Sequence, residues 1–470
     1  MRATHHAGSG HAPTRASIGQ THRAHRPAPR NPRRQLVVIA SSSSSSSSSR
    51  GATWSDSAPV LVSGAGIAGL ATAAALAKVG IPVRLYEQGP GLRQEGAAIG
   101  LWANAWRALD AVGAGPALRG DHLLLNRVQL CSSGGEVLRS FGFEECDAAR
   151  GPTGSEFRGV RRAALLQALY DQIPEADRVV TFGTAIEEVL SYGGEQSSEP
   201  STSGSGGGAV AARLSDGRTV YGSALVGADG VGSVVARRLG LARPNYAGYV
   251  ALRGVAEFPS AAAAAGLGLP TDTIRQIWGE GVRAGLYPVT PTSMYWYVCY
   301  NLDEQAAASK PSSAAERQRL ALGAVKGWAW GVEEAIRSTP PEDITFGAMA
   351  DRWTRGAFGQ GCVTLAGDAA HPMTPNLGQG GCTALEDAVV LARSLREAGS
   401  PQGPALAAAL RRYEEARSGR CFPLTARANL MGAALQIPLS PVCTVRNAFV
   451  RSAFKPAHFM DHTTYDCGTL

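Results

Sequence analysis

The sequence predicts an α/β protein with a parallel, Rossmann-like dinucleotide-binding sheet and a second domain around an antiparallel sheet. Two observations carry this prediction. A strand, a glycine-rich turn, a helix and a second strand follow one another within about 30 residues from Ala58 onward. The stretch 249–300 is rich in aromatic and β-branched residues at strand spacing. A chain of 470 residues is long enough for two or three ordinary domains.

The first strand and helix enclose a glycine pattern typical of dinucleotide binding. An apolar run at 60–62 precedes Gly64, Gly66 and Gly69, which have the spacing G-x-G-x-x-G and open the helical stretch 68–78. In this pattern the first glycine permits the tight turn, the second lets backbone approach a pyrophosphate, and the third lets the helix pack on the strand. A purely structural turn is the alternative.

The second strand, predicted at 81–87, ends on an acid. Glu87 follows Gly69 by 18 residues. A carboxylate at this position accepts hydrogen bonds from both hydroxyls of an adenosine ribose and repels a 2′-phosphate. The turn is therefore predicted to hold FAD or NAD in preference to NADP.

The middle of the chain reads as strands and loops. The segments 209–214 and 219–221 flank Asp216 and Gly217, which predicts a hairpin. The Ser/Gly tract 193–208 is predicted to be a loop insertion, because it has no apolar surface to bury. Helical spacing is found at 314–336, 385–395 and 405–430.

A second glycine cluster lies at 365–382. A buried strand ends near Asp368, a proline-braced segment follows through Pro375, and glycines at 378–381 open a new helix. Such a cluster can press bare backbone against a flat ring, and the helix N-terminus can stabilise negative charge there. Taken alone, the segment could be one more loop of an α/β domain.

The positive charge of the chain gathers at its N-terminus. The chain has 45 basic and 38 acidic residues, and residues 1–55 hold eight arginines and no acid. From Asp56 onward 37 basic and 38 acidic residues remain, so the sequence predicts no nucleic-acid-binding face. No run of about 18 apolar residues occurs, and we expect no transmembrane segment.

Residues 1–57 have the composition of a disordered, transit peptide-like leader. They are rich in arginine and serine, include nine consecutive serines at 41–49, and contain no acid before Asp56. The abundance of serine favours the plastid (chloroplast) over the mitochondrion as the destination. An uncleaved disordered tail is the alternative.

The eight cysteines show no C-x-x-C pair and no matching histidine spacing, which predicts neither a metal site nor a disulfide framework. They are Cys131, Cys146, Cys299, Cys362, Cys382, Cys421, Cys443 and Cys467.

Together these segments resemble the single-component, class A FAD-dependent monooxygenases, the group that includes salicylate hydroxylase-like enzymes and zeaxanthin epoxidase. The resemblance covers about residues 58–425 in order. The segments 96–99, 104–110 and 378–382, with the closing 462–468, are most similar to the plant monooxygenase 1-like branch. The resemblance implies a glutathione-reductase-type FAD fold with a second, antiparallel-sheet substrate domain, as in aromatic hydroxylases.

The resemblance assigns roles to particular residues. The ADP half of FAD is expected at Gly64, Gly66, Gly69 and Glu87. Arg162 is expected near the pyrophosphate, Asp368 at the ribityl-pyrophosphate portion, and Asp229 with Gly230 at a motif associated with FAD and NAD(P)H. The isoalloxazine is expected to be lined by Pro375, Gly378, Gln379, Gly380 and Gly381. Two positions depart from the family pattern: Ala236 replaces an arginine and Ala164 replaces an acid.

The expected domains follow from these segments. They are the leader at 1–57, a discontinuous FAD-binding domain at 58–122, 161–243 and 351–425, a substrate domain at 123–160 and 244–350, and a C-terminal extension at 426–470.

The implied chemistry is oxygen transfer through a flavin C4a-hydroperoxide, with NADH or NADPH and O₂ as co-substrates, to a small hydrophobic or aromatic metabolite. A phenolic compound, a quinone and an isoprenoid remain open as substrates. The alternatives are an FAD-dependent NAD(P)H oxidase or reductase without oxygen transfer, and a catalytically silent FAD-binding protein. The cofactor supplies the difficult chemistry, so no nucleophile triad or metal is required.

Four further side chains have open roles. His371 is expected to order the loop beneath the flavin, with acid–base work as the alternative. Arg93 either contacts the flavin or lies on the surface. Alternation along a strand would send Tyr295 and Tyr297 to one face, as a wall for substrate or as packing.

Overall fold

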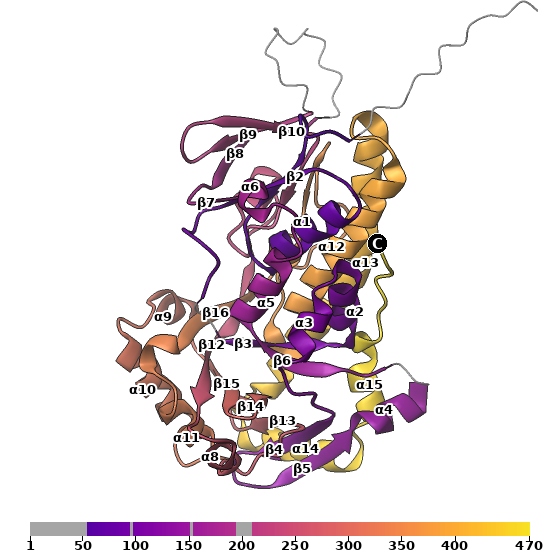
Figure 1. The fold of residues 1–470 in the computed structure, drawn as a ribbon. Coiled ribbons are helices and arrows are strands. Elements are labelled where there is room, and N and C mark those ends of the chain that lie inside the picture. Colours follow the sequence, from indigo (N-terminus) through magenta and orange to yellow (C-terminus); the bar gives the residue numbers. More distant parts are fainter. Residues whose placement is uncertain (1–53, 95–96, 151–153, 194–208) are drawn as a thin grey trace, which may run out of the picture. The chain divides into compact units, whose positions relative to one another are not determined.

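The computed structural model describes residues 54–94, 97–150, 154–193 and 209–470. Most of the predicted leader, Gly96 and nearly all of the predicted Ser/Gly insertion lie outside these residues. Residues 51–470 form one compact unit. This unit contains a parallel sheet and a larger, mostly antiparallel sheet, each with helices packed against it (Figure 1), which confirms the predicted α/β fold class.

The parallel sheet contains the predicted βαβ unit. Its strands are β1 (Val60–Ser63), β2 (Val83–Glu87), β7 (Val180–Phe182), β11 (Ala224–Gly227) and β17 (Val363–Leu365), in the order β17-β11-β1-β2-β7. Strands β1 and β2 pair in parallel, and α1 (Ile67–Lys78) connects them. Helix α1 contains six alanines and Gly69 and is buried from Ile67 to Leu76, which lets it pack closely against neighbouring helices.

Helices cover this sheet and build the upper part of Figure 1. They are α2 (Ala103–Val112), α3 (Gly115–Arg119), α5 (Arg162–Tyr170), α6 (Ala176–Val179), α7 (Val234–Arg238), α12 (Gly380–Ala398) and α13 (Gly403–Leu435). Helix α12 packs against α1, α2 and α13. The helices predicted at 385–395 and 405–430 are confirmed, and α13 continues through Pro423 to a length of 33 residues.

The larger sheet has the strand order β16-β12-β15-β14-β13-β4-β5. Neighbouring strands are antiparallel except β13 and β4. The strands are β4 (Arg127–Ser132), β5 (Val137–Gly142), β12 (Asn245–Glu257), β13 (Thr273–Trp278), β14 (Val282–Thr290), β15 (Ser293–Asn301) and β16 (Thr345–Asp351). The domain boundaries expected from the sequence stay a prediction.

Helices cover one face of this sheet. They include α8 (Ala261–Ala265), α9 (Glu304–Ala308), α10 (Ala314–Ala324) and α11 (Val332–Arg337). The single helix expected over 314–336 is wrong. The chain breaks between α10 and α11, where Gly327, Trp330 and Gly331 all have positive φ, a conformation that ends a right-handed helix.

The remaining described strands form two small sheets. One is the antiparallel ribbon of β3 (Ala98–Trp102) and β6 (Phe157–Arg161). The other contains β8 (Ile186–Ser191), β9 (Val210–Leu214) and β10 (Thr219–Gly222). Strands β9 and β10 pair in antiparallel register, which confirms the hairpin predicted around Asp216 and Gly217. Helix α4 (Phe143–Arg150) follows β5.

The C-terminal part returns to the parallel-sheet half. After α14 (Ser440–Ser452) and α15 (Pro456–Met460), the yellow segment in Figure 1 runs past α2 toward the flank of α13. Among the described helices, none is by itself long and apolar enough to span a bilayer. Only α13 and α14 taken together meet that test, and a bend of 119° separates them.

Candidate active site

The glycine-rich turn after β1 combines a structural and an open part. Gly64 has φ +98°, and a Cβ atom there would lie 2.8 Å from Ala228 O. A Cβ atom at Gly69 would collide with Gly64 O, whereas one at Gly66 would have no atom within 4 Å. Gly64 and Gly69 therefore serve close packing, and Gly66 leaves bare backbone open beside the N-terminus of α1.

Glu87 ties the end of β2 to this turn. Its Oε2 accepts from Ala65 N at 2.7 Å, and its Oε1 accepts from Gly89 N at 2.8 Å. Each carboxylate oxygen has a further lone pair, so both can still accept from a ribose hydroxyl.

Asp229 lies beside the same turn, because the Cβ position of Gly64 is 3.1 Å from its Cα. Its Oδ2 accepts from Val234 N at 2.8 Å, at the start of α7. Its Oδ1 is buried and has no hydrogen-bond partner. Gly230 follows with φ +77°. A buried carboxylate oxygen without a partner is costly, and a ligand donor would satisfy it.

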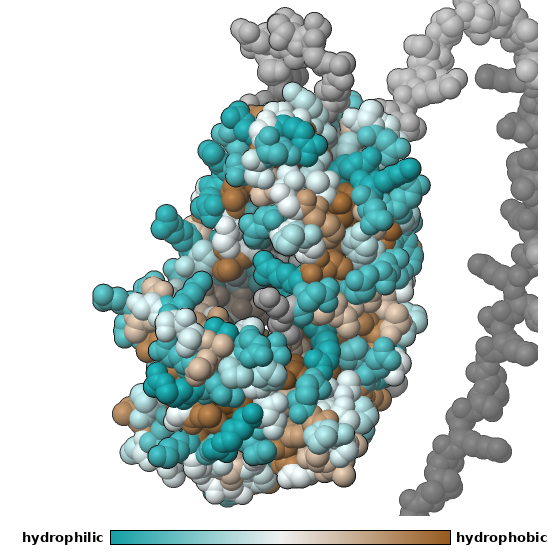
Figure 2. All heavy atoms as spheres, turned by 60° about the vertical axis from the view of Figure 1, so that its left-hand side comes forward, coloured by the Kyte–Doolittle hydropathy of each residue, from teal (hydrophilic) through white to brown (hydrophobic). Residues whose placement is uncertain are grey.

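Asp368 follows β17 in a short 3₁₀ turn, Gly367–Ala369. Its residue surface is exposed, whereas Gly367 and Ala369 on either side are buried. Protein nevertheless surrounds the carboxyl group closely enough for desolvation to raise its pKa. An exposed group in such surroundings lies in a recess and not on an outer surface. Figure 2 shows a hollow between the parts of the surface that belong to the two sheets.

Three arginines approach this recess. Desolvation lowers the pKa of Arg162, and the nearby positive charges of Arg93 and Arg253 lower it further, while Asp368 acts in the opposite direction. Within the part of the chain that the structure describes, none of the three arginines pairs with a carboxylate. Arg253 donates to Met349 Sδ at 3.2 Å. Arg93 is exposed, whereas Arg162 and Arg253 are partly buried, and cations without a carboxylate partner fit an anionic ligand such as a pyrophosphate.

The second glycine cluster presents backbone to the same recess. Pro375 and Gly378 are exposed, whereas Leu377 and Gln379 beside them are buried. Gly378 has φ +63°, and a Cβ atom there would lie 3.1 Å from Trp102 Nε1. The cluster therefore rests on the ribbon strand β3 while its outer side stays open.

Close contacts connect these parts into one line. A Cβ atom at Gly380 would lie 3.7 Å from Asp368 Oδ1, and one at Gly367 would lie 2.8 Å from Ala68 Cβ on α1. A Cβ atom at Gly381 would collide with Ile99 of β3. The residues predicted from the two glycine motifs thus lie along one path, which runs from Glu87 through the β1 turn to the cluster at 378–381.

A buried ionic network lies directly behind Gln379. Asn104 Nδ2 donates to Gln379 Oε1 at 2.8 Å and to Glu386 Oε1 at 2.6 Å. Arg417 is fully buried and binds Glu386 Oε2 at 2.7 Å and Asp387 Oδ1 at 2.6 Å. Sequence reasoning missed Asn104 and Arg417 as parts of the site. The two adjacent acids in an apolar helix were the available signal, because buried acids require partners.

The C-terminal segment closes this network from outside. Arg420 binds Glu386 Oε1 at 3.1 Å and His462 O at 2.7 Å. Its guanidinium carbon lies 4.4 Å from the centre of the Tyr465 ring. The last residues of the chain are therefore coupled to α12, the helix that begins at the glycine cluster.

His371 is part of the network and not of the open surface. Its Nε2 lies 2.8 Å from Asp387 Oδ2, which also accepts from Gly367 N at 2.7 Å. Burial opposes the charged imidazole, but Asp387 and Cys421 outweigh it and raise the pKa of His371 well above its usual value. This geometry favours the expected ordering role, because His371 and the Asp368 turn share one carboxylate.

The ligand atoms of His371, Asp387 and Cys421 lie within 4.8 Å of one another, which is compatible with a metal site. However, Arg417 donates to Asp387 at 2.6 Å and lies 3.6 Å from Cys421 Sγ. The guanidinium already supplies the positive charge that a cation would bring.

Tyrosine side chains of the large sheet gather near Arg253. Tyr287 stacks on Tyr295 with ring centroids 4.5 Å apart, and Tyr297 lies 6.3 Å from Tyr295. Trp296 points to the opposite face, where its Nε1 donates to Thr339 Oγ1 at 2.8 Å. The predicted alternation is confirmed. Desolvation raises the pKa of Tyr287 well above its usual value, and Arg253 and Cys382 lie within electrostatic range of it.

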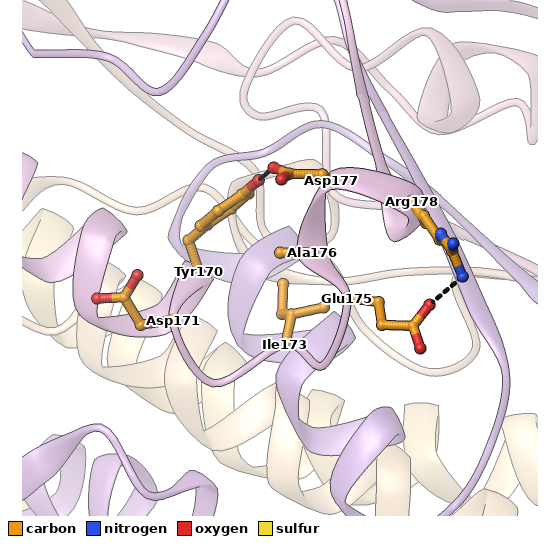
Figure 3. A pocket seen from close by; sticks show the side chains of 7 residues that line it. All are labelled: Tyr170, Asp171, Ile173, Glu175, Ala176, Asp177 and Arg178. Carbon is orange, nitrogen blue, oxygen red and sulfur yellow. Dashed lines mark hydrogen bonds and ion pairs between the residues drawn. The ribbon is translucent and has the colours of Figure 1, made fainter.

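A separate depression of about 470 Å³ lies at the far end of α5. Figure 3 shows that four of its polar side chains pair with one another: Tyr170 with Asp177, and Glu175 with Arg178. It contains none of the residues predicted from the two glycine motifs. We therefore assign the functional site to the recess between the two sheets.

Comparison with known proteins shows the family of the chain. The sequence profile of the family described as "FAD binding domain" matches residues 57–428. The chain is 32% identical over 394 residues to the aurachin C monooxygenase/isomerase of Stigmatella aurantiaca, covering 83% of this chain and 93% of that protein. It is 29% identical over 437 residues to monooxygenase 2 of Arabidopsis thaliana, covering 88% and 98%.

Solved structures show the same fold. Klebsiella pneumoniae HpxO, in complex with FAD and uric acid, aligns with a TM-score of 0.71 and 27% identity. The alignment covers 86% of this chain and 96% of that one. The 2,6-dihydroxypyridine-3-hydroxylase of Arthrobacter nicotinovorans aligns with a TM-score of 0.65 at 21% identity, covering 82% and 96%.

Proposed function

The chain belongs to the FAD-binding domain family of FAD-dependent monooxygenases, and on that premise we propose that it uses NAD(P)H and O₂ to hydroxylate or epoxidise a small hydrophobic or aromatic metabolite. The single observation that carries the proposal is the path from Glu87 to the cluster at 378–381, bordered by arginines without counterions.

The residues present fit FAD along this path. Glu87 would accept from the ribose, bare backbone at Gly66 would approach the pyrophosphate, and Arg162 would offset its negative charge. Asp368 would contact the adjoining polyol, whose hydroxyls can donate to its carboxylate. Exposed backbone at Gly378 would lie against the isoalloxazine.

When bound, FAD supplies hydride acceptance from NAD(P)H and activation of O₂. The protein contributes orientation and charge. The N-terminus of α12 would stabilise negative charge on the reduced ring by about 0.3–1 kcal/mol. The network of Asn104, Glu386 and Arg417 would hold Gln379 in place behind the ring. Because these side chains are buried, the loop is preorganised before substrate enters.

We propose that the substrate lies between the glycine cluster and the wall formed by Tyr287 and Tyr295. Stacked phenol rings favour a flat or unsaturated molecule such as a phenolic compound, a quinone or an isoprenoid. Arg253, which has no carboxylate partner among the described residues, would face an anionic oxygen of the substrate or of the reduced ring.

One experiment tests the assignment on the purified full-length protein. Its visible spectrum should show bound flavin, and anaerobic NADH or NADPH should bleach it. A screen of phenols, quinones and xanthophylls under ¹⁸O₂ should then find one that accelerates bleaching and gains labelled oxygen. Peroxide as the product with every candidate would favour an oxidase, and flavin that neither nucleotide bleaches would favour a silent scaffold. A colourless folded protein that does not bind FAD would refute the proposal.

We also propose that residues 1–57 direct import into the plastid and are then removed. The arginine- and serine-rich, acid-free composition of 1–55 supports this. Import of radiolabelled chain into isolated chloroplasts should yield a shorter product. Its N-terminal sequence should begin after residue 1 and no later than about residue 58, and uptake by mitochondria alone would contradict the proposal.

A further inference from the structure

Exposed apolar side chains concentrate in one C-terminal stretch of the chain, on and just before helix α14. Eleven large apolar side chains are exposed in the described chain, and five of them lie between residues 430 and 449. Leu439, Val442, Val445 and Phe449 are 58%, 40%, 71% and 57% exposed. Their spacing of three, three and four residues places them on one side of α14 and its N-cap. We call these four residues the α14 face.

The neighbouring side of α14, about 100° further round the helix, is fixed to the protein. Cys443 and Val450 are buried. Arg446 donates to Leu435 O at 3.0 Å and to Gly279 O at 3.3 Å. A surface helix normally turns its apolar side inward and its polar side to water. Here the buried side is anchored and the exposed flank beside it is apolar, so the exposed stripe is held in a defined position.

Basic residues outnumber acidic residues around the α14 face. No acidic residue occurs in the sequence between Glu415 and Asp461. Arg451 and Lys455, both exposed, follow the apolar stripe at the C-terminal end of α14. Two acids face α14 from other elements: Glu280 lies within electrostatic range of Arg446, and Glu136 binds Arg451 at 2.6 Å. Because both members of that pair are about half exposed, it contributes little.

We propose that the α14 face is the contact surface for an anionic lipid bilayer, in which the helix lies along the interface without spanning it. An apolar stripe bordered by cations is the pattern of interfacial helices, whose apolar side enters about 5–10 Å into the headgroup region. Anionic headgroups attract the neighbouring cations, each contributing about a few-fold to binding. This inference does not depend on the oxygenase assignment.

A second copy of the chain fits the α14 face less well than a lipid bilayer does. A stable dimer needs about 800 Å² from each partner, whereas the stripe is one side of a 13-residue helix. A two-fold axis through the stripe would also bring symmetry-related copies of Arg451 and Lys455 toward one another. A bilayer requires neither a large complementary area nor a fixed shape.

The test uses the full-length, FAD-loaded protein and sedimentation with vesicles. Vesicles of 70% phosphatidylcholine and 30% phosphatidylglycerol should bind at least about tenfold more protein than vesicles of phosphatidylcholine alone. The double variant Val445→Glu/Phe449→Glu should bind the anionic vesicles at least about tenfold less than the wild type. The matched control Leu190→Glu/Tyr221→Glu, at side chains 40% and 48% exposed outside the α14 face, adds the same charge and should bind normally.

Two results would overturn the proposal: absence of wild-type binding to anionic vesicles, or unchanged binding of the double variant. A dimer in sedimentation velocity that the double variant dissociates, without vesicle binding, would instead identify the face as a subunit interface and also refute it. The flavin spectrum and melting temperature verify folding. Should the double variant misfold, Val445→Ser/Phe449→Ser replaces it, and loss of wild-type binding in about 1 M salt tests the charge contribution independently.

Discussion

Acid should weaken the attachment of the C-terminal segment through His462. This side chain is 4% exposed, and its ring lies 6.2 Å from the rings of Trp102 and Phe459. Burial, together with the charge of Arg427, lowers the pKa of His462 to about 4 from an unfolded value of 6.5. The unfolded chain therefore takes up a proton at a pH where the folded chain does not.

The size of the effect follows from these two values. Well above pH 6.5, His462 does not lower the free energy of unfolding, because it is neutral in both the folded and the unfolded chain. As the pH falls from 7.5 to 5.0, the free energy of unfolding should decrease by about 2 kcal/mol from this residue alone, and by about 3 kcal/mol once the pH is below 4. Asp387, whose pKa burial raises but His371 and Arg417 lower to about 2, loses its contribution at lower pH, below about 4.

The measurement is urea unfolding of the wild type and of His462→Phe at pH 7.5 and 5.0, followed by tryptophan and flavin fluorescence. Phenylalanine suits the aromatic surroundings of His462 and cannot titrate. The wild type should lose about 2 kcal/mol more than the variant between the two pH values. Because Trp102 contacts both His462 and the Gly378 loop, flavin release should show the same difference. Equal losses in the two proteins would refute the reasoning.

Three further substitutions separate structure from function. Gly66→Ala should change apoprotein stability by less than about 1 kcal/mol but weaken FAD binding at least about tenfold, measured by flavin fluorescence titration, because its Cβ meets only the space meant for ligand. Arg417→Met should destabilise the protein by about 3–5 kcal/mol in urea unfolding, since the carboxylates of Glu386 and Asp387 lose their buried counterion. Arg253→Gln should leave melting and flavin content unchanged but raise the KM for an anionic substrate about tenfold in steady-state assays, and an unchanged KM would exclude that contact.

The parts of the fold that follow from local spacing were predictable. The spacing of Gly64, Gly66 and Gly69 predicts the turn because the positive φ of Gly64 and the close approach of Gly69 to Gly64 O act within a few residues. The hairpin at Asp216 and Gly217 and the alternation of Tyr295 and Trp296 are equally local. The helix break near Trp330 was missed, because helical spacing continues through it and only the positive φ values show the interruption.

The partners of the buried charges could not be predicted. Glu386 and Asp387 are conspicuous in the sequence, but Arg417 lies about 30 residues away and is one of many arginines. Some arginines pair with a carboxylate, and others, such as Arg162 among the described residues, do not. The distances between several elements decide which arginine pairs.

By itself, the sequence determined that a dinucleotide-binding unit is present and where its glycines lie, because turn geometry and helix packing constrain neighbouring residues directly. Tertiary structure alone decided that the cluster at 378–381 lies beside Asp368, that the last residues of the chain support it, and that the α14 face remains uncovered. Burial and charge pairing arise between segments that are tens to hundreds of residues apart. They are settled only when those segments pack together.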